Sequence, residues 1–243
     1  MKENLKILVI VPAFNEEDCI EKVIYDLKDA NSSYDVLIVN DGSKDKTSIV
    51  AKSTKKAFVI DLVSNLGIGG AVQTGFKFAA RNNYDICLQF DGDGQHIATE
   101  IEKLIAPIIS GEVDVVIGSR FTITHSGWKS SLPRRMGIFV FRILNYLLIR
   151  QRITDSTSGF RAYNKEALNF LADHYPMDYP EPEAIILLGK NGFKMKEIHA
   201  DMKARETGTS SINYRKAVYY MIKVVLAILM TSIRPKIKRV KNA

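Results

Sequence analysis

Short apolar runs that alternate with helix-length amphipathic stretches constrain the fold of this chain most strongly. Five runs rich in Val, Ile and Leu occupy residues 5–11, 34–40, 57–62, 84–90 and 113–119. Amphipathic stretches separate them over residues 16–30, 45–56, 70–81 and 97–110. Continuous apolar runs of this length are typical of strands buried on both faces. The alternation, about every 25 residues, therefore predicts a parallel sheet with right-handed crossovers and helices on both faces.

The pattern changes after Phe121. A polar segment at 122–135 precedes an apolar, aromatic-rich stretch at 136–150 that predicts a helix. Residues 155–171 predict a turn, a short strand and a helix, and residues 182–200 predict a helix, a turn at Gly192 and a strand. Because no repeat or low-complexity linker interrupts the chain, we expect residues 1–212 to form a single domain.

Composition limits the classes of partner. The chain has 243 residues, 46% of them hydrophobic and 25% charged, as in a globular protein. Its net charge of +7 favours anionic partners, whether nucleic acid, anionic lipid or phosphorylated substrates. The segment after Ile233, "RPKIKRVKNA", contributes five basic residues and no acid. Cys19 and Cys87 are far apart and lack the spacing of a zinc site.

Polar residues follow three of the predicted strands, in "VPAFNEE" (11–17), "VNDGSKDKT" (39–47) and "FDGDGQH" (90–96). The carboxyl ends of parallel strands share one edge of a sheet, where ligands bind. Taken singly, Asn15 or Asp45 could cap the helix that follows it. Taken together, three acidic loops at one edge repel one another unless a cation or hydrogen-bond donors compensate them.

A divalent metal is the compensation that Asp91 and Asp93 predict. Carboxylate oxygens suit Mg²⁺ or Mn²⁺, and Gln95 offers a further oxygen. The glycines of "NLGIGGAVQTG" (65–75), Gly69 among them, are typical of a phosphate-cradling turn at a helix N-terminus. Tight helix-to-strand packing is the alternative. A nicotinamide dinucleotide fold is disfavoured because these glycines follow the third predicted strand rather than the first.

In their order along residues 5–212, these motifs, with "GSRF" and "TDSTSGFRAYNKEAL", resemble those of family-two glycosyltransferases. Within that family the chain is similar to the polyprenyl-phosphate sugar transferases of the dolichol-phosphate mannose synthase type. The resemblance implies an α/β GT-A fold, with a Rossmann-like, mostly parallel mixed sheet flanked by helices. It also implies a nucleotide-sugar half at 1–119 and an acceptor half at 120–212.

The resemblance also implies roles for individual residues on the donor side. Asp91 matches a position near the ribose and the sugar, and Asp93 and Gln95 match the ligands of Mg²⁺ or Mn²⁺. The metal would stabilise the departing nucleotide diphosphate during an inverting transfer. The positions expected to bind the nucleotide-sugar, most often a UDP-sugar, are Pro12, Ala13, Asn15, Glu16, Asp41, Gly69, Asp91 and Asp93.

On the acceptor side, Arg120 and Arg134 or Arg135 match positions that hold the acceptor phosphate, for which the guanidinium fork is suited. Arg205 matches a catalytic loop that closes over the diphosphate. Asp155 matches a catalytic position that activates or orients the acceptor, although it could instead cap a turn with Ser156 or Thr157.

Two other functions stay open. Glu181 or Glu183 stands where relatives that glycosylate sugar hydroxyls carry a base, so the chain could extend a lipid-linked glycan; both could instead be the acidic first turn of a helix. A non-catalytic nucleotide-sugar-binding membrane adaptor is a third, less favoured reading. The leading reading is transfer to undecaprenyl or a related polyprenyl phosphate, for cell-surface glycan synthesis. Nucleic acid is not an expected partner.

The C-terminal segment 213–243 predicts a basic amphipathic helix. Residues 217–233 are apolar except for Lys223, and basic residues flank both ends. We expect this helix to lie in the membrane interface, although it could instead pack on the protein's own core or on a dimer partner. A separate small membrane protein could supply an anchor. The N-terminal apolar run is broken by Pro12, so we expect no signal peptide and a protein peripheral to the cytoplasmic face.

Overall fold

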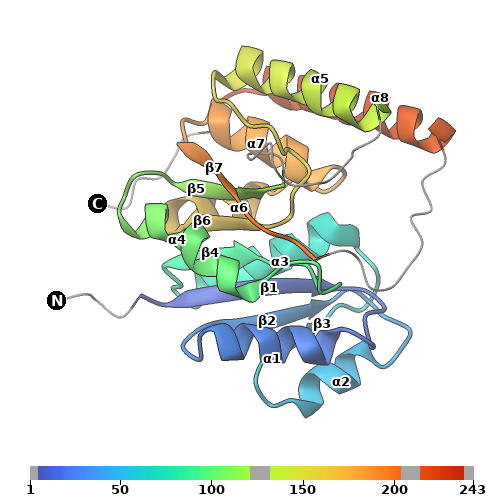
Figure 1. Ribbon diagram of the computed structural model, residues 1–243, viewed down its shortest axis with the longest axis vertical. Helices are drawn as coiled ribbons and strands as arrows, with labels where there is room; N and C mark the ends of the chain where they lie inside the picture. The colour runs from blue at the N-terminus through green and yellow to red at the C-terminus, as the bar shows by residue number, and fades with distance from the viewer. Residues whose placement is uncertain (1–4, 121–131, 204–213, 238–243) are drawn as a thin grey trace.

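The computed structural model describes residues 5–120, 132–203 and 214–237, and one seven-stranded sheet forms the centre of that part of the chain (Figure 1). The strand order is β3-β2-β1-β4-β6-β5-β7. The strands are β1 Ile7–Ala13, β2 Asp35–Asn40, β3 Phe58–Asp61, β4 Ile86–Gln89, β5 Val115–Ser119, β6 Arg161–Asn164 and β7 Met195–His199.

All pairings in this sheet are parallel except those of β6, which runs antiparallel to both β4 and β5. Ala162 of β6 lies opposite Leu88 on one side and Val116 on the other. The mostly parallel mixed sheet expected from the sequence is therefore confirmed. Because β6 lies between two strands of the first half, the two halves of the chain share one sheet.

Helices cover both faces of the sheet. They are α1 Ile20–Ala30, α2 Thr47–Ser53, α3 Gly67–Arg81, the 3₁₀ turn η1 Ala98–Glu100, α4 Ile101–Ile109, α5 Leu132–Ile149, α6 Lys165–His174, α7 Pro180–Lys190 and α8 Tyr214–Ile233. Alternation along β1 builds the two cores, since successive side chains of a strand point to opposite faces. Val9 and Val11 pack with α1 and α4, whereas Leu8 and Ile10 pack with α3, α6 and α7.

Helices α5 and α8 form a further layer outside α7 (Figure 1). Phe141, Ile186, Val224 and Ile228 are the buried residues of this contact. Lys190, at the end of α7, donates to the carbonyls at the end of α8, which stabilises both helix ends. Among the described residues, no helix combines the length and the apolarity that a membrane crossing requires. The described part of the tail helix thus packs on the protein's own core through one side.

The structure shortens several predicted helices. The helix expected from residue 16 begins at Ile20, because the amides of Glu16 and Glu17 donate to Thr47 and Asp45 of the neighbouring loop. The stretch at 97–110 divides into η1 and α4. The later predictions at 155–171 and 182–200 are confirmed, with the turn at Gly192 in the left-handed conformation at φ 82°.

The contact of α3 with β1 depends on Gly75. A Cβ atom at this position would lie 2.4 Å from Cγ2 of Ile10 in the closed core. We therefore expect Gly75→Ala to lower the free energy of unfolding by about 1–3 kcal/mol, the usual cost of overpacking. Urea unfolding followed by circular dichroism measures this. Lys77→Ala, exposed on the same helix, is the control, and equal stability of the two variants would contradict the contact.

Candidate active site

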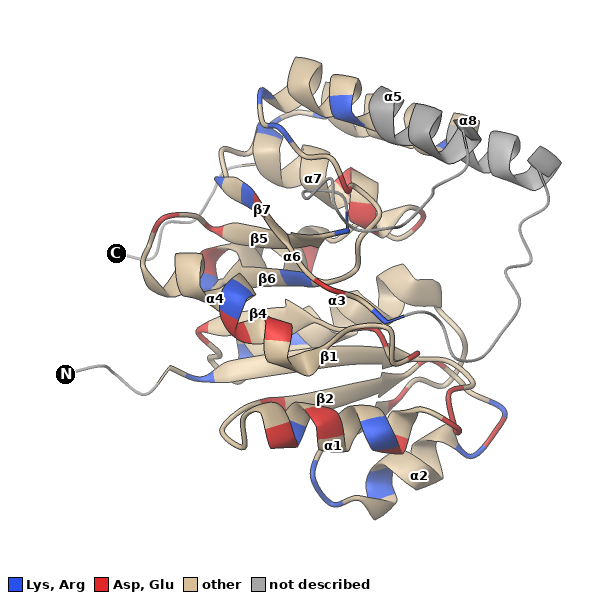
Figure 2. Ribbon diagram, viewed as in Figure 1, with Lys and Arg blue, Asp and Glu red and all other residues tan. Residues whose placement is uncertain are grey.

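A cleft opens at the carboxyl ends of the parallel strands. Six of the residues predicted to bind a nucleotide-sugar line it: Pro12, Ala13, Glu16, Asp41, Asp91 and Asp93. Phe14, Ile68, Ala71 and Gly92, which the sequence did not single out, complete the lining. Figure 2 shows acidic residues in the loops that follow β1 and β2. The three acidic loops therefore lie together, as their positions after parallel strands predict.

Asn15 joins two of these loops and is not part of the cleft lining. Its side-chain oxygen accepts from the amide of Lys44 at 2.9 Å, and its own amide donates to Ser43 at 2.9 Å. It does not cap α1. Asp45, by contrast, accepts from the first amide of α2, that of Thr47, at 3.0 Å in the turn that leads into the helix, although the N-cap position itself is Lys46. The hydrogen bonds of Asn15 hold the β1–α1 and β2–α2 loops together.

Asp41 and Gly69 both position α3. Asp41 is buried, and its carboxylate accepts from the amide of Leu66 at 2.7 Å, directly before the helix. Gly69 does not line the cleft. A Cβ atom there would lie 2.5 Å from the carbonyl oxygen of Met177, so its absence lets the chain before α7 approach closely. The close contact of Gly69 is thus with the segment before α7 and not with a strand, which the packing alternative expected.

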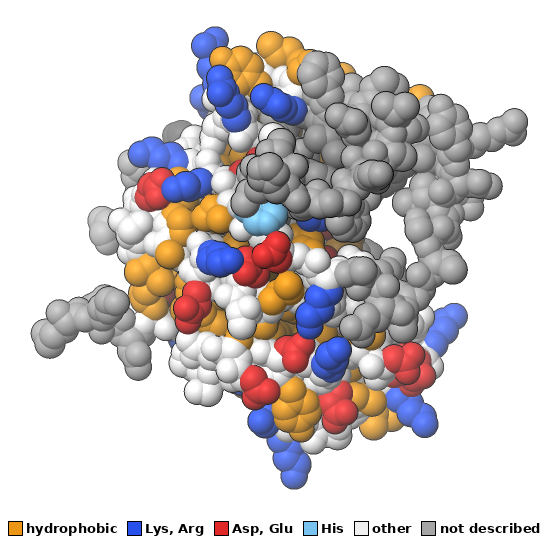
Figure 3. Space-filling view, in the orientation of Figure 1, with side chains coloured by type: hydrophobic (Ala, Val, Ile, Leu, Met, Phe, Trp, Pro, Cys, Tyr) orange, Lys and Arg blue, Asp and Glu red, His pale blue; other side chains and the backbone are white. Residues whose placement is uncertain are grey.

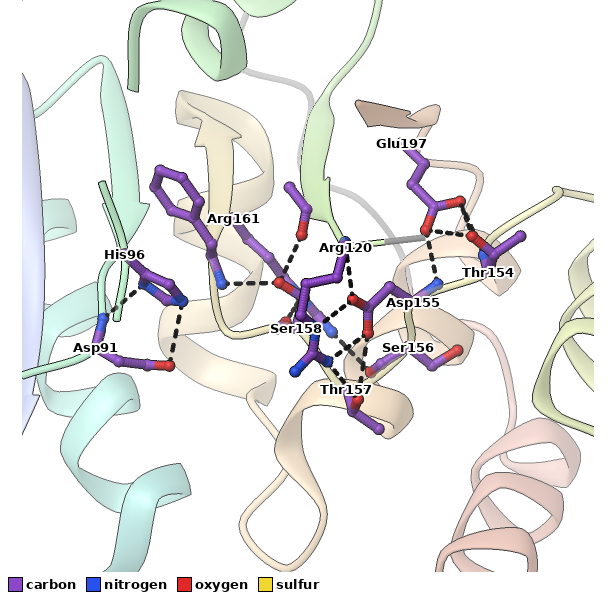
Figure 4. A network of polar contacts seen from close by, with 12 residues as sticks. Asp91, His96, Arg120, Thr154, Asp155, Ser156, Thr157, Ser158, Arg161 and Glu197 are labelled. Carbon is purple, nitrogen blue, oxygen red and sulfur yellow. Dashed lines mark hydrogen bonds and ion pairs between the residues drawn. The ribbon is translucent and has the colours of Figure 1, made fainter. Parts of the chain in front are cut away.

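Asp91 lies on the floor of the cleft beside His96 (Figure 4). Its backbone amide donates to Nδ1 of His96 at 3.0 Å, and Nε2 of the ring lies 3.4 Å from its carboxylate. Although 37% of the Asp91 side chain remains accessible, burial of the rest and the charge of Asp93 raise its pKa to about 7. Burial lowers the pKa of His96 to about 4, so the ring is neutral at neutral pH.

The donor set at Asp91 and Asp93 fits a hard divalent cation. Asp93 accepts from the amide of Gln95 at 3.1 Å across the left-handed Gly94, so the two carboxylates share one tight turn. Burial and the charge of Asp93 both disfavour the ionised form of Asp91, and a cation would offset the repulsion between the two carboxylates. Over residues 5–120, 132–203 and 214–237, no cluster of three His, Cys, Asp or Glu side chains is placed to hold a metal. Phosphate oxygens and water would have to complete the coordination, as Mg²⁺ and Mn²⁺ permit.

Arg120 and Asp155 form an ion pair (Figure 4). Nε and one terminal nitrogen of Arg120 donate to the two carboxylate oxygens, each at 2.9 Å, and the same terminal nitrogen reaches Thr157 at 3.1 Å. Asp155 is 1% exposed, whereas Arg120 keeps 23% of its side chain accessible. Both carboxylate oxygens of Asp155 are engaged by the guanidinium, so the geometry favours orientation of Arg120 over general-base catalysis by Asp155.

Arg161 holds the loop that carries Asp155. This side chain is 1% exposed and donates to three backbone carbonyls, those of Ser156, Ser158 and Glu181, at 2.7–2.9 Å. It thereby joins the loop before β6 to the first turn of α7. Its importance was not predicted, because the three acceptors are main-chain atoms that no sequence pattern marks.

The two glutamates of the α7 first turn differ in environment. Glu183 is 6% exposed, and its carboxylate accepts from the amide of Tyr179 and from the hydroxyl of Thr231 in α8. One carboxylate oxygen is thus engaged by the chain before α7 and the other by the tail helix, which disfavours Glu183 as a base. Glu181 is half-buried, and burial together with the charge of Asp91 raises its pKa, so it remains a candidate base.

The side chains of three predicted residues lie outside the part of the chain that the structure describes. Arg205 lies outside the described residues. Arg134 and Arg135 belong to the first turn of α5, but their side chains lie outside the described set.

Two exposed apolar residues at the cleft could have been found from the sequence. Phe14 and Ile68 keep 44% and 41% of their surface exposed, although each stands inside a motif that was already noted. An exposed aromatic residue in a polar motif is a signal of ligand contact.

Comparison with known proteins agrees with this geometry. Residues 8–171 match the family model described as "Glycosyl transferase family 2". A UDP-N-acetylglucosamine–dolichyl-phosphate N-acetylglucosaminyltransferase of Methanococcus voltae is 35% identical over 79% of this chain and 83% of its own. A polyprenol monophosphomannose synthase of Mycolicibacterium smegmatis is 28% identical over 87% and 84%. Glucosyl-3-phosphoglycerate synthase of Mycobacterium tuberculosis, solved with Mn²⁺, UDP and phosphoglyceric acid, shares the fold with a TM-score of 0.72 at 20% identity, over 96% and 80%.

Loss of the Arg161 donors should be costly for stability. We expect Arg161→Met to lower the free energy of unfolding by about 3 kcal/mol or more, because buried carbonyls that lose a charged donor stay unsatisfied. Chemical denaturation measures the difference. Arg152→Met, at an exposed arginine, should change stability by less than about 0.5 kcal/mol. If both variants are equally stable, the three carbonyls have other partners.

Proposed function

The chain belongs to glycosyl transferase family 2, and we propose that it transfers a sugar from a UDP-sugar to a polyprenyl phosphate, with inversion, at the cytoplasmic face of the cell membrane. Undecaprenyl phosphate, for the synthesis of cell-surface glycans, is the proposed acceptor. The observation that carries the proposal is the cleft itself, which gathers six predicted donor residues, Asp91 and Asp93 among them. The two relatives, which name dolichyl phosphate and polyprenol in their activities, support the lipid acceptor.

On the donor side, we assign the ribose and the sugar to Asp91, and a Mg²⁺ or Mn²⁺ ion with the diphosphate to Asp93 and Gln95. The ion, when bound, would stabilise the charge of the departing UDP. Pro12, Ala13 and the exposed ring of Phe14 form the part of the cleft that suits the base. Asn15 and Asp41 would act by holding the surrounding loops, through the bonds to Lys44 and Leu66.

On the acceptor side, Arg120 is the described cation best placed for a phosphate. It is held bidentately by Asp155 and remains partly accessible, and its charge is felt at Asp91. A phosphate acceptor is already ionised at neutral pH and needs no strong base, which suits a site where Asp155 is paired. Arg134, Arg135 and Arg205 remain proposed further contacts to the acceptor phosphate or the diphosphate.

A second candidate function follows from Glu181. Its raised pKa and its position within the field of Asp91 suit a general base for a sugar hydroxyl. In that case the chain would extend a lipid-linked glycan rather than glycosylate a lipid phosphate. The two reactions give different products, since only a sugar joined to the lipid through one phosphate is released as a monosaccharide by mild acid.

The outer layer of the molecule suits a membrane surface. Exposed apolar residues stand on α5 and α8, namely Ile143, Tyr146, Leu147, Ile222, Leu226, Leu229, Met230 and Ile233. Exposed arginines accompany them, among them Arg142, Arg152 and Arg234. Figure 3 shows basic and apolar side chains together at the top of the molecule, over the described end of α5. Apolar groups beside cations match the interface of an anionic bilayer. A small membrane protein or a second copy of the chain is the alternative partner of this face.

We expect the purified protein, given Mn²⁺, undecaprenyl phosphate and a panel of radiolabelled UDP-sugars, to form a lipid product that mild acid converts to a monosaccharide. Asp93→Asn should lower the transfer rate about 100-fold or more, because the leaving diphosphate loses its Lewis-acid support. Asp173→Asn, at an exposed aspartate of α6, is the control.

Each alternative outcome of this assay is specific. Metal-dependent transfer that survives Asp93→Asn would remove Asp93 from the metal site. When membranes that carry lipid-linked glycans replace undecaprenyl phosphate, a product from which mild acid releases an oligosaccharide, formed by the wild type and lost in Glu181→Gln, would establish the second candidate function. The absence of transfer to any lipid would favour the non-catalytic adaptor.

The membrane face can be tested with Leu226→Glu. Leu226 is 56% exposed on α8, so the variant should fold normally but bind phosphatidylglycerol vesicles about tenfold more weakly, by loss of one buried leucine side chain. Vesicle co-sedimentation measures this. Ile49→Glu is the matched control, because Ile49 is 68% exposed on α2, at the opposite end of the molecule in Figure 1. Unchanged vesicle binding would assign the face to a protein partner.

A further inference from the structure

We infer that His96 is a positioning residue for the donor site: its neutral imidazole holds both the main chain and the carboxylate of Asp91 and so sets the direction in which that carboxylate faces the donor. The inference rests on the proposed function of the cleft, in which Asp91 contacts the sugar nucleotide. The His96 side chain is only 5% exposed and does not line the cleft. It therefore acts on a ligand through Asp91 rather than by direct contact.

The hydrogen bond from the Asp91 amide defines the tautomer of the ring. Since the Asp91 amide donates to Nδ1 at 3.0 Å, Nδ1 carries no proton. A neutral ring then carries its proton on Nε2, which lies 3.4 Å from the Asp91 carboxylate. One imidazole therefore accepts from the backbone of Asp91 and presents a donor to its side chain, and the reverse tautomer would place two N–H groups against each other.

Packing fixes the ring itself. His96 stacks on Phe160 with ring centroids 4.7 Å apart and an interplanar angle of 19°, and meets the edge of Phe90 at 5.2 Å. On the other side of the carboxylate, Gly159 approaches so closely that a Cβ atom there would lie 2.8 Å from an Asp91 oxygen. The carboxylate thus lies between a clamped imidazole and a backbone without a side chain, which leaves it little rotational freedom.

The same residue ties the metal turn to the second half of the chain. His96 pairs with Met202 in an isolated antiparallel bridge, and the amide of Lys203 donates to the carbonyl of Gln95 at 2.8 Å. The backbone on both sides of the imidazole is therefore fixed. A purely structural role would need only an aromatic ring at this place, whereas positioning needs the two nitrogens.

Two substitutions separate these roles. His96→Phe keeps the stacked ring and removes both nitrogens, and His96→Asn restores an acceptor close to the place of Nδ1. We expect His96→Phe to raise the KM for the UDP-sugar about 10- to 100-fold, with the KM for the lipid unchanged, as for loss of a group that orients a ligand-binding side chain. His96→Asn should recover most of the donor affinity. His174→Phe, at an exposed histidine, is the control.

Two further measurements do not depend on turnover. Calorimetric titration with UDP and Mn²⁺ should show the weakest binding of UDP for His96→Phe and a recovered affinity for His96→Asn. Long-range ¹H–¹⁵N correlation spectra of the wild type should show His96 protonated on Nε2 alone. A donor KM and a UDP affinity of His96→Phe within about twofold of the wild type, or a ring protonated on Nδ1, would overturn the inference. Failure of the proposed transfer reaction would appear separately, as absent turnover with these binding and spectral results intact.

Discussion

The loop before β6 and the first turn of α7 depend on one buried guanidinium, that of Arg161. Its strand lies between β4, which leads to Asp91, and β5, which leads to Arg120. From that central place it donates to carbonyls of the loop before β6 and of the first turn of α7. A buried charge is tolerated where carbonyl dipoles and carboxylates surround it, and Asp91 and Glu181 lie within its field. Removing it would release two segments together.

Balance between opposite charges explains the arrangement of the remaining polar groups. Asp91 and Asp93 bring negative charge to the cleft, and Arg120 and Arg161 act to lower the pKa of Asp91. Burial and the charge of Asp93 outweigh the two arginines, so the pKa of Asp91 is raised. An incompletely compensated acidic turn is a favourable place for a divalent cation and its phosphate ligands. The charges of the protein alone therefore make the Asp91–Asp93 turn favourable for a cation before any ligand binds.

Strand periodicity and loop position predicted much of this structure, because both are local properties. The five early strands and the acidic cleft follow from them, whereas the mixed sheet was implied by the resemblance to a known family and not by periodicity. The choice between Glu181 and Glu183 could not be made locally: residues two apart on a helix point about 200° apart, and only tertiary packing decides which one faces the cleft. The roles of His96 and Arg161 could not be predicted for a similar reason, because both side chains bind backbone groups. His96 accepts from an amide across a tight turn, and Arg161 donates to a carbonyl distant in the sequence.

The reversed direction of β6 changes where useful residues can arise along the chain. In the parallel strands the cleft edge comes after the last strand residue, so ligand-binding loops follow their strands. In β6 the cleft edge comes before the first residue, Arg161, so the segment at 154–160 reaches the site by preceding its strand. Insertions ahead of β6 would therefore alter the loop that carries Asp155, the partner of Arg120, whereas insertions behind it would fall at the opposite end of the strand, away from this ion pair.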